Sequence, residues 1–171
     1  MKEILILDAN AFFSAKQLTD LDVHLFYTTS GIEEEIENNQ TAHFVFESLK
    51  SQNRLMVADP DPTFLNEVRD TSKLTGDNTV ISENDLGIIA LALELKQQYK
   101  YPEYMIKVVS SDFAIQNICK KKEIVYLSFK HGTIRKQVNW VYACSDCRKK
   151  FKMVPKGGEC DVCGSKIHRS R

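Results

Sequence analysis

The chain has 171 residues, of which 43% are hydrophobic and 27% are charged, a composition typical of a water-soluble globular protein. No apolar run approaches the roughly 20 residues of a membrane-spanning helix, and residues 4–7 are too few for a signal peptide, so we expect a cytoplasmic protein with no membrane partner. The net charge of zero conceals an asymmetry, because residues 1–129 carry 12 Lys and Arg against 20 Asp and Glu, while residues 130–171 carry 11 against 3.

The first third of the chain is expected to alternate between strands and helices. The apolar run at residues 4–7 is typical of a fully buried parallel strand, and residues 10–18 are expected to form a helix. The elements that follow are a strand at 23–29, helices at 30–39 and 41–52, and a strand that ends at Asp59.

The same alternation continues to residue 128. Asp61 and Pro62 predict the N-cap and the first residue of a helix that stops at Gly76. Residues 82–99 are apolar nearly all round from Leu86 to Leu95, which indicates a buried helix. A strand at 108–109, a helix from Asp112 and a strand at 123–128 complete the series. Strands separated by helices predict an α/β fold, with a parallel sheet covered on both faces.

Four of the five cysteines form two C-x-x-C pairs near the C-terminus. They are Cys144, Cys147, Cys160 and Cys163, and Gly164 follows the last of them. This spacing suits a tetrahedral four-cysteine zinc site, although iron or a redox dithiol pair is an alternative. A unit as short as residues 140–171 needs such a metal to fold, and residues 130–139 are expected to be its basic linker to the domain 1–129. Cys119 stands alone and is expected in the core.

The positive charge of the second unit predicts an anionic partner. Its basic residues are concentrated around the cysteines and are Arg148, Lys149, Lys150, Lys152 and Lys156. RNA is the leading candidate, and docking of the basic unit on its acidic neighbour is the alternative. The nearby Trp140, Tyr142 and Phe151 could stack on RNA bases or pack the core of the small unit itself.

Several acidic residues are expected at one edge of the sheet. Ligands of an open parallel sheet bind beyond the carboxyl ends of its strands, and Asp8 and Asp112 each follow a strand. Asp85, in the first turn of the buried helix, could reach the same edge or could be the acidic partner of Ser82 in a capping box. Asp59 is sufficiently explained by capping in the Asp59-Pro-Asp61-Pro stretch.

Two further sets of polar residues stay open at this point. Glu33 and Glu35 flank the apolar stripe of their helix on opposite sides, and periodicity does not decide between them. Asn10, Ser111 and Asn117 could orient water or phosphate, or could serve local backbone roles.

Four stretches resemble, in this order, the acidic motifs of the PIN-domain ribonucleases: ILILDANAFF, YTTSGIEEEI, ISENDLGIIALAL and VVSSDFAIQN. With WVYACSDC and CDVCG after them, the resemblance narrows to the Nin-one-binding endonucleases in their short archaeal form. The family pattern has a Glu directly before an apolar residue, which selects Glu35 over Glu33. The other three matching acids are Asp8, Asp85 and Asp112. One departure is Ser30-Gly31, where the family often has Pro-Ser.

The resemblance implies a PIN-like parallel sheet covered by helices, followed by a small four-cysteine zinc ribbon. It implies a metal-dependent endoribonuclease that matures the 3′ end of small-subunit ribosomal RNA by hydrolysing a phosphodiester bond. The substrate would then be precursor RNA within a pre-ribosomal particle, with ribosome assembly proteins as further partners. Oxygen ligands alone suit Mg²⁺ or Mn²⁺, and such an ion would relieve the repulsion between clustered carboxylates.

Three other functions are compatible with parts of this pattern. A PIN ribonuclease with another RNA target, such as a toxin, would share every acid, although the zinc unit argues against a toxin. A haloacid-dehalogenase phosphatase would need a second Asp where this chain has Asn10. A non-catalytic RNA-binding assembly factor would not need four intact acids.

Overall fold

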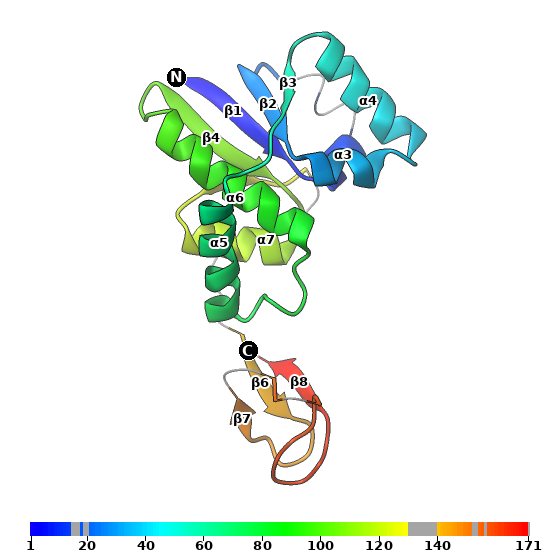
Figure 1. Cartoon of the computed structure of the whole chain (residues 1–171), viewed down its shortest axis with the longest axis vertical. Helices are drawn as coiled ribbons and strands as arrows, with labels where there is room; N and C mark the ends of the chain where they lie inside the picture. The colour runs from blue at the N-terminus through cyan, green and yellow to red at the C-terminus, as the bar shows by residue number, and fades with distance from the viewer. Residues whose placement is uncertain (15–17, 19–20, 130–139, 152–153, 156, 171) are drawn as a thin grey trace.

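The computed structural model describes residues 1–14, 18, 21–129, 140–151, 154–155 and 157–170. It has a larger α/β unit and a small β unit beneath it (Figure 1). The predicted fold class is confirmed. The expected linker, residues 130–139, lies outside the described residues, so the exact domain boundaries stay a prediction.

Five parallel strands form the sheet of the larger unit. They are β1 (Lys2–Leu7), β2 (Leu25–Thr28), β3 (Leu55–Val57), β4 (Tyr104–Val109) and β5 (Val125–Leu127). Their order across the sheet is β3-β2-β1-β4-β5, with Ile6 of β1 paired to Tyr27 of β2 and to Val108 of β4. The order reverses between β1 and β4, so the carboxyl ends of these two strands border the crevice where such sheets bind ligands.

Helices cover the sheet in two groups. The first group is α1 (Ala9–Phe12), α3 (Ser30–Ile36) and α4 (Gln40–Ser51), and the second is α5 (Pro62–Thr75), α6 (Glu83–Gln98) and α7 (Phe113–Lys121). The members of each group pack against one another, as right-handed crossovers on the two sides of β1 require. One helix was expected at residues 10–18. In the structure, α1 covers only the first part of this range and ends at Phe12, and residues 15–17 are not described.

The local signals in the sequence explain where several elements start and stop. The Asp61 side chain accepts a hydrogen bond from the backbone N–H of Thr63 (2.8 Å), which caps α5 with Pro62 as its first residue. Gly76 ends α5 in the left-handed region, with φ of 75°. The expected N-cap and stop of this helix are therefore confirmed.

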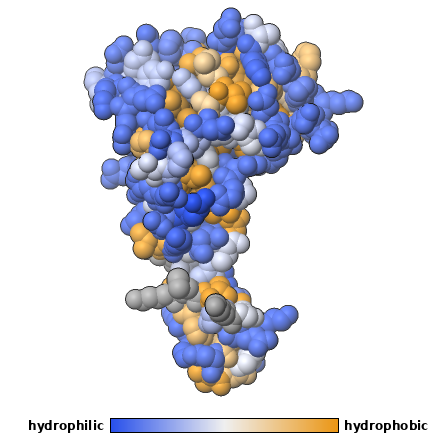
Figure 2. Space-filling model, in the orientation of Figure 1, coloured by the Kyte–Doolittle hydropathy of each residue, from blue (hydrophilic) through white to orange (hydrophobic). Residues whose placement is uncertain are grey.

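The core lies between the sheet and both helix groups. Residues 4–7 of β1 are fully buried, as are Ile88, Ile89 and Ala90 of α6, so the predicted buried strand and buried helix are confirmed. Figure 2 shows that hydrophilic side chains cover most of the visible face of the larger unit. In the described ranges, no helix combines the length and the apolar character needed to cross a membrane.

The small unit is an antiparallel sheet of three short strands. They are β6 (Val141–Cys144), β7 (Lys150–Phe151) and β8 (Ile167–Ser170), with β6 in the middle. This unit, called the ribbon below and comprising residues 140–170 as far as they are described, lies next to the end of α5 and the segment that leads to α6 (Figure 1).

Candidate active site

Asp8 lies directly after the carboxyl end of β1, the strand that pairs with β4. One side-chain oxygen caps α1 by accepting the backbone N–H of Asn10 (2.7 Å), and the other accepts the hydroxyl of Ser110. The residue is only 3% exposed. Burial raises the pKa of Asp8 to about 6 despite these two hydrogen bonds, and the nearby carboxylates of Asp85 and Asp112 add to the increase. Asp85 and Asp112 are therefore both close enough to Asp8 for their charges to act on it.

Asp112 is fixed by the start of α7. Its side chain accepts the backbone N–H of Ala114 (2.5 Å), so it is the N-cap of that helix. Its own N–H donates to the hydroxyl oxygen of Ser110 at 3.0 Å. The capping role expected for an Asp at this junction is present, and the same carboxylate lies beside Asp8 at the end of the strands.

Asp85 is fixed by the start of α6. Its Oδ2 accepts both the N–H (3.2 Å) and the hydroxyl (2.7 Å) of Ser82, and the Ser82 oxygen accepts the N–H of Asp85 (3.1 Å). The capping box considered from the sequence therefore exists. It does not remove Asp85 from the acid group, because its charge still acts on Asp8.

Glu35 and Glu33 point to different neighbours. Glu35 accepts a hydrogen bond from the side-chain amide of Asn84 (3.3 Å), the residue directly before Asp85. Glu33 instead pairs with Lys50 of α4 at 3.0 Å. Glu35 therefore borders the start of α6, whereas Glu33 faces away along α4. The choice of Glu35 as the fourth acid stays a prediction that this arrangement favours.

Replacing the two glutamates separately tests that choice, because Glu35→Gln and Glu33→Gln remove the same charge. We expect Glu35→Gln to lower the rate of metal-dependent RNA cleavage about 100-fold or more, the scale of losing a group at the reacting atoms. Glu33→Gln removes only an exposed ion pair and should change the rate less than about threefold. The measurement is the cleavage rate at saturating metal. A larger loss in Glu33→Gln than in Glu35→Gln would identify Glu33 as the site residue.

The four acids fit a hydrated hard cation better than a tightly enclosed one. Among the described residues, only the four cysteines bring three or more ligand atoms within 4.8 Å of one another. The acids Asp8, Glu35, Asp85 and Asp112 do not form such a group. Mg²⁺ and Mn²⁺ retain several waters and use few direct carboxylates, so they do not need three carboxylates in contact with one ion. A cation here would also offset the repulsion felt by the buried Asp8.

Ser110 is a site residue that the sequence reasoning missed. Its hydroxyl donates to Asp8 and accepts the N–H of Asp112, so it holds two of the acids in a fixed relation. It is 2% exposed. Its place two residues before Asp112 was the available signal, because Ser side chains commonly bond to nearby backbone at helix starts.

The residues that could orient water or phosphate have local contacts in the structure, and that role stays a prediction. Ser111 shares a hydrogen bond with Ser128 (3.1 Å). Asn117 is fully buried and donates to Asp77 (2.7 Å). Asn10 acts on Asp8 through its backbone N–H.

Asp59 does not cap α5, which was its expected role. Asp61 alone has that role, while Asp59 accepts the backbone N–H (3.0 Å) and the hydroxyl (2.8 Å) of Ser30 at the start of α3. A cavity of about 290 Å³ opens at this point, lined by Thr29, Asp59 and Asn84 among others. It therefore lies between the starts of α3 and α6, next to the residue that holds Glu35.

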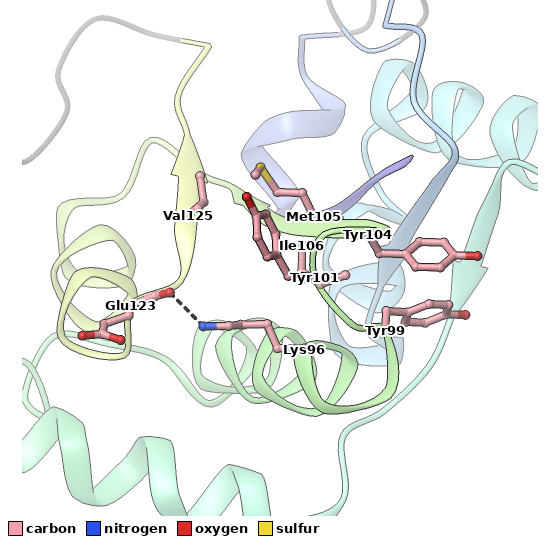
Figure 3. A pocket seen from close by; sticks show the side chains of 8 residues that line it. All are labelled: Lys96, Tyr99, Tyr101, Tyr104, Met105, Ile106, Glu123 and Val125. Atoms are coloured by element: carbon pink, nitrogen blue, oxygen red, sulfur yellow. Dashed lines mark hydrogen bonds between the residues drawn. The ribbon is translucent and has the colours of Figure 1, made fainter. Parts of the chain in front are cut away.

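A second cavity of about 290 Å³ lies at the opposite, amino end of the strands (Figure 3). It is lined by side chains from the end of α6 and the starts of β4 and β5, including Tyr99, Tyr104 and Val125. The Lys96 amine donates to the backbone oxygen of Glu123 (2.9 Å) across it, and the Glu123 carboxylate points away. No acid of the crevice lines it.

The four cysteines of the ribbon converge on one point. The sulfurs of Cys144 and Cys163 are 3.3 Å apart, and those of Cys147 and Cys160 are 3.5 Å apart. Zinc at about 2.3 Å from each sulfur would place the sulfurs about 3.8 Å apart, so the set fits a tetrahedral ion with no open position. Hydrogen bonds from Ser165 lower the pKa of Cys163 to about 6, whereas desolvation and hydrogen bonds with the neighbouring cysteines raise the pKa of Cys147 to about 12.

The geometry around this cluster agrees with the sequence argument. Gly164 adopts φ of 74°, a conformation that L side chains rarely adopt, and its N–H donates to the backbone oxygen of Cys160 (2.9 Å). Cys119 is fully buried in α7, as expected for a core residue, and is not part of the cluster.

The basic residues of the ribbon are not equivalent. Arg148 and Lys150 are exposed, and Lys149 is paired with Asp161 at 2.8 Å. Lys152 and Lys156 lie outside the described residues. Their role in RNA binding stays a prediction.

Two of the three ribbon aromatics contact the larger unit. The backbone N–H of Trp140 donates to the backbone oxygen of Thr75 (2.9 Å), and the side-chain hydroxyl of Tyr142 shares a hydrogen bond with the hydroxyl of Thr79 (3.1 Å). Neither alternative considered for them, base stacking or packing within the ribbon, anticipated this contact. Phe151 lies 5.4 Å from the Lys149 amine, within the ribbon.

Comparison with known proteins gives matches along nearly the whole chain. Residues 5–95 match the family described as PIN domain of ribonuclease. The chain is 32% identical to Endoribonuclease Nob1 of Pyrococcus abyssi, over 98% of this chain and 93% of that protein. It is 29% identical to Endoribonuclease Nob1 of Methanothermobacter thermautotrophicus, over 97% and 92%. It is also 30% identical to Ribonuclease VapC1 of Thermoplasma acidophilum, over 97% of this chain and 77% of that protein.

Proposed function

The chain belongs to the PIN-domain endoribonucleases, with archaeal Nob1 proteins among its relatives, and from that premise we propose that it matures the 3′ end of small-subunit ribosomal RNA. The observation that supports this most is the combination of acids near the carboxyl ends of the strands with a four-cysteine ribbon, in a chain that aligns with Nob1 over nearly its full length. The reaction is hydrolysis of one phosphodiester bond in the precursor RNA.

In the proposed mechanism, Asp8, Glu35, Asp85 and Asp112 hold a divalent cation, Mg²⁺ or Mn²⁺. When bound, this ion supplies Lewis acidity and offsets negative charge on the phosphate and on the leaving oxygen. The chain itself keeps the carboxylates in place. Ser110 links Asp8 to Asp112, and the capping box fixes Asp85.

The negative net charge of the nuclease domain makes its surface outside the metal site a poor RNA-binding surface. Residues 1–129 carry a net charge of −8, so phosphate is repelled except where the cation lies. We propose that the ribbon supplies the affinity through Arg148, Lys149, Lys150, Lys152 and Lys156. Lys149 contributes less than its neighbours because Asp161 already pairs with it.

Removing two of these cations should weaken RNA binding in a salt-dependent way. Each phosphate contact on a single strand contributes a slope of about 0.7 to the dependence of log affinity on log salt. Arg148→Gln with Lys150→Gln should therefore make the slope shallower by about 1.4. The measurement is RNA affinity across a salt series, with Asp8→Asn present to prevent cleavage. The control, Lys2→Gln with Lys100→Gln, removes two charges near the amino ends of the strands. An equal loss in both double variants would contradict a special role of the ribbon.

The proposed function is tested by mapping cleavage of a defined RNA. The substrate spans the 3′ end of the mature small-subunit sequence and its downstream precursor extension. We expect a single metal-dependent cut at the mature 3′ end, absent with Asp8→Asn. Dispersed cuts, or a cut elsewhere, would favour a PIN ribonuclease with another target. The similarity to Ribonuclease VapC1 is the reason to test this alternative.

A further inference from the structure

A wholly buried carboxylate lies where the ribbon meets the nuclease domain. Asp77 follows α5 in the segment that leads to α6, and it is 0% exposed. Its Oδ2 accepts the side-chain amide of Asn117 in α7 (2.7 Å), and its Oδ1 accepts a guanidinium N–H of Arg169 in the ribbon strand β8. Asp77 is not one of the crevice acids, so the proposed chemistry does not account for it.

The backbone of Asp77 is also engaged. Its N–H donates to the backbone oxygen of Ser72 (2.9 Å), and its carbonyl accepts the N–H groups of Val80 and Ile81, each at 3.0 Å. The residue therefore organises the segment from residue 77 to 81 that leads directly to Ser82, the N-cap of α6.

The ribbon makes further contacts with the end of α5 and the residues that follow it. The Arg169 guanidinium lies over the Trp140 ring, 4.1 Å from its centroid. The backbone N–H of Trp140 donates to the backbone oxygen of Thr75 (2.9 Å). A Cβ at Gly76 would lie 2.8 Å from Trp140, so a glycine is required there for this close approach as well as for its φ of 75°. The buried Tyr142 hydroxyl donates to the Gly76 oxygen at 3.4 Å.

The electrostatics make Arg169 a required partner. Burying a charged group away from water is strongly unfavourable unless an opposite charge pairs with it. Removing one member of a buried pair therefore leaves the other charge uncompensated. Asn117 is neutral, so only Arg169 balances the charge of Asp77 among the contacts that the structure describes for it. A planar guanidinium can pair with the carboxylate and stack on Trp140 at the same time, which a Lys could not do.

We propose that Asp77 is a positioning residue that docks the ribbon on the nuclease domain through Arg169, so that both move as one body. This inference rests on the proposed function for its consequence. RNA bound by the basic ribbon then meets the acids at a fixed distance, because Asp77 contacts α7, whose N-cap is Asp112, and precedes α6, which carries Asp85. The ribbon thereby raises the effective concentration of the scissile bond at the acids.

Docking is tested first without RNA, on the full zinc-loaded chain. Amide ¹⁵N relaxation gives the rotational correlation times of the two units, which we expect to be equal in the native chain. In Arg169→Gln, which leaves Asp77 buried without its cation, the ribbon should tumble faster than the nuclease domain. Equal correlation times in Arg169→Gln, or unequal ones in the native chain, would overturn the proposal.

A double variant separates pairing from general damage. Arg169→Gln with Asp77→Asn removes both charges, so the ribbon should be closer to native docking than in Arg169→Gln alone. If the loss of docking in the double variant equalled the sum of the losses in the two single variants, the proposed pairing would be overturned. The matched control is Asp161→Asn, the same change in the exposed pair with Lys149, and it should leave the correlation times equal.

Cleavage kinetics then test the consequence. Undocking should raise KM for the precursor RNA about tenfold or more with kcat nearly unchanged, since avidity is lost and the acids remain. Asp77→Asn should also raise KM, and because Asp77 is buried and anionic, that effect cannot be a lost phosphate contact. A lower kcat at unchanged KM would indicate misfolding and would count against positioning. If the native chain does not cut this RNA, the proposed function fails while the relaxation result still decides the docking.

Discussion

Asp112→Asn is expected to lower the rate of metal-dependent RNA cleavage about 1,000-fold, the scale of removing a group that stabilises developing charge. The fold should survive, because Asn is as good an N-cap as Asp and its side-chain oxygen can still accept the N–H of Ala114. Asp8→Asn should lower the rate in the same way. Its single amide oxygen can still accept the N–H of Asn10, while its NH₂ group replaces the oxygen that accepts the Ser110 hydroxyl and would instead donate to that hydroxyl oxygen. The measurement is the single-turnover rate with Mg²⁺ and with Mn²⁺.

The chain offers a matched control for this change. Asp61 caps α5 as Asp112 caps α7, but it is not one of the acids that act on Asp8. Asp61→Asn should therefore leave the rate within about twofold, because the cap is preserved and no site charge is lost. Full activity of Asp112→Asn in Mn²⁺ would remove Asp112 from the proposed metal site.

Replacing Cys144 and Cys147 together by Ser is expected to reduce bound zinc from about one ion per chain to none, because two of four thiolate ligands are lost. Binding of structural zinc contributes about 10–16 kcal/mol to the folding of small zinc domains, so the ribbon should unfold. Metal analysis gives the zinc content, and amide NMR spectra report the loss of β6, β7 and β8.

The control for this change is Cys119→Ser, which places a hydroxyl in the core of α7 but leaves the ribbon unaltered. Its zinc content should be that of the native chain, although it should be less stable by about 1–3 kcal/mol if the hydroxyl finds no partner. Retention of zinc by the double variant would show that these cysteines are not the ligands. Iron in place of zinc, after expression with ample zinc, would refute the identity of the metal.

Features set by neighbouring residues could be predicted from the sequence. The cap at Asp61, the stop at Gly76 and the buried run at residues 4–7 each follow from a few adjacent side chains. The cysteine spacing likewise predicts one four-ligand cluster, because two short knuckles at this separation can offer four sulfurs to a common ion. Acids directly after strands were expected at one edge, because parallel strands all end on the same side.

The partner of each side chain across the fold was decided only by the tertiary structure. Helical periodicity identifies the buried stripe of α3 but not what lies on either side of it, so Lys50 beside Glu33 and Asn84 beside Glu35 appear only when α4 and α6 are placed. The hydroxyl of Ser110 reaches Asp8 because β1 and β4 are neighbours, which the chain order does not state.

The contact between the ribbon and the nuclease domain shows the same limit most clearly. Asp77 and Arg169 are 92 residues apart, and both lie in polar stretches without periodicity. Their burial depends on how two separately formed units meet, and a polar residue in a loop carries no local sign of the distant charge it will face. The sequence alone therefore predicts the elements, the cysteine cluster and the edge at which the acids are expected, whereas long-range packing decides which polar groups pair.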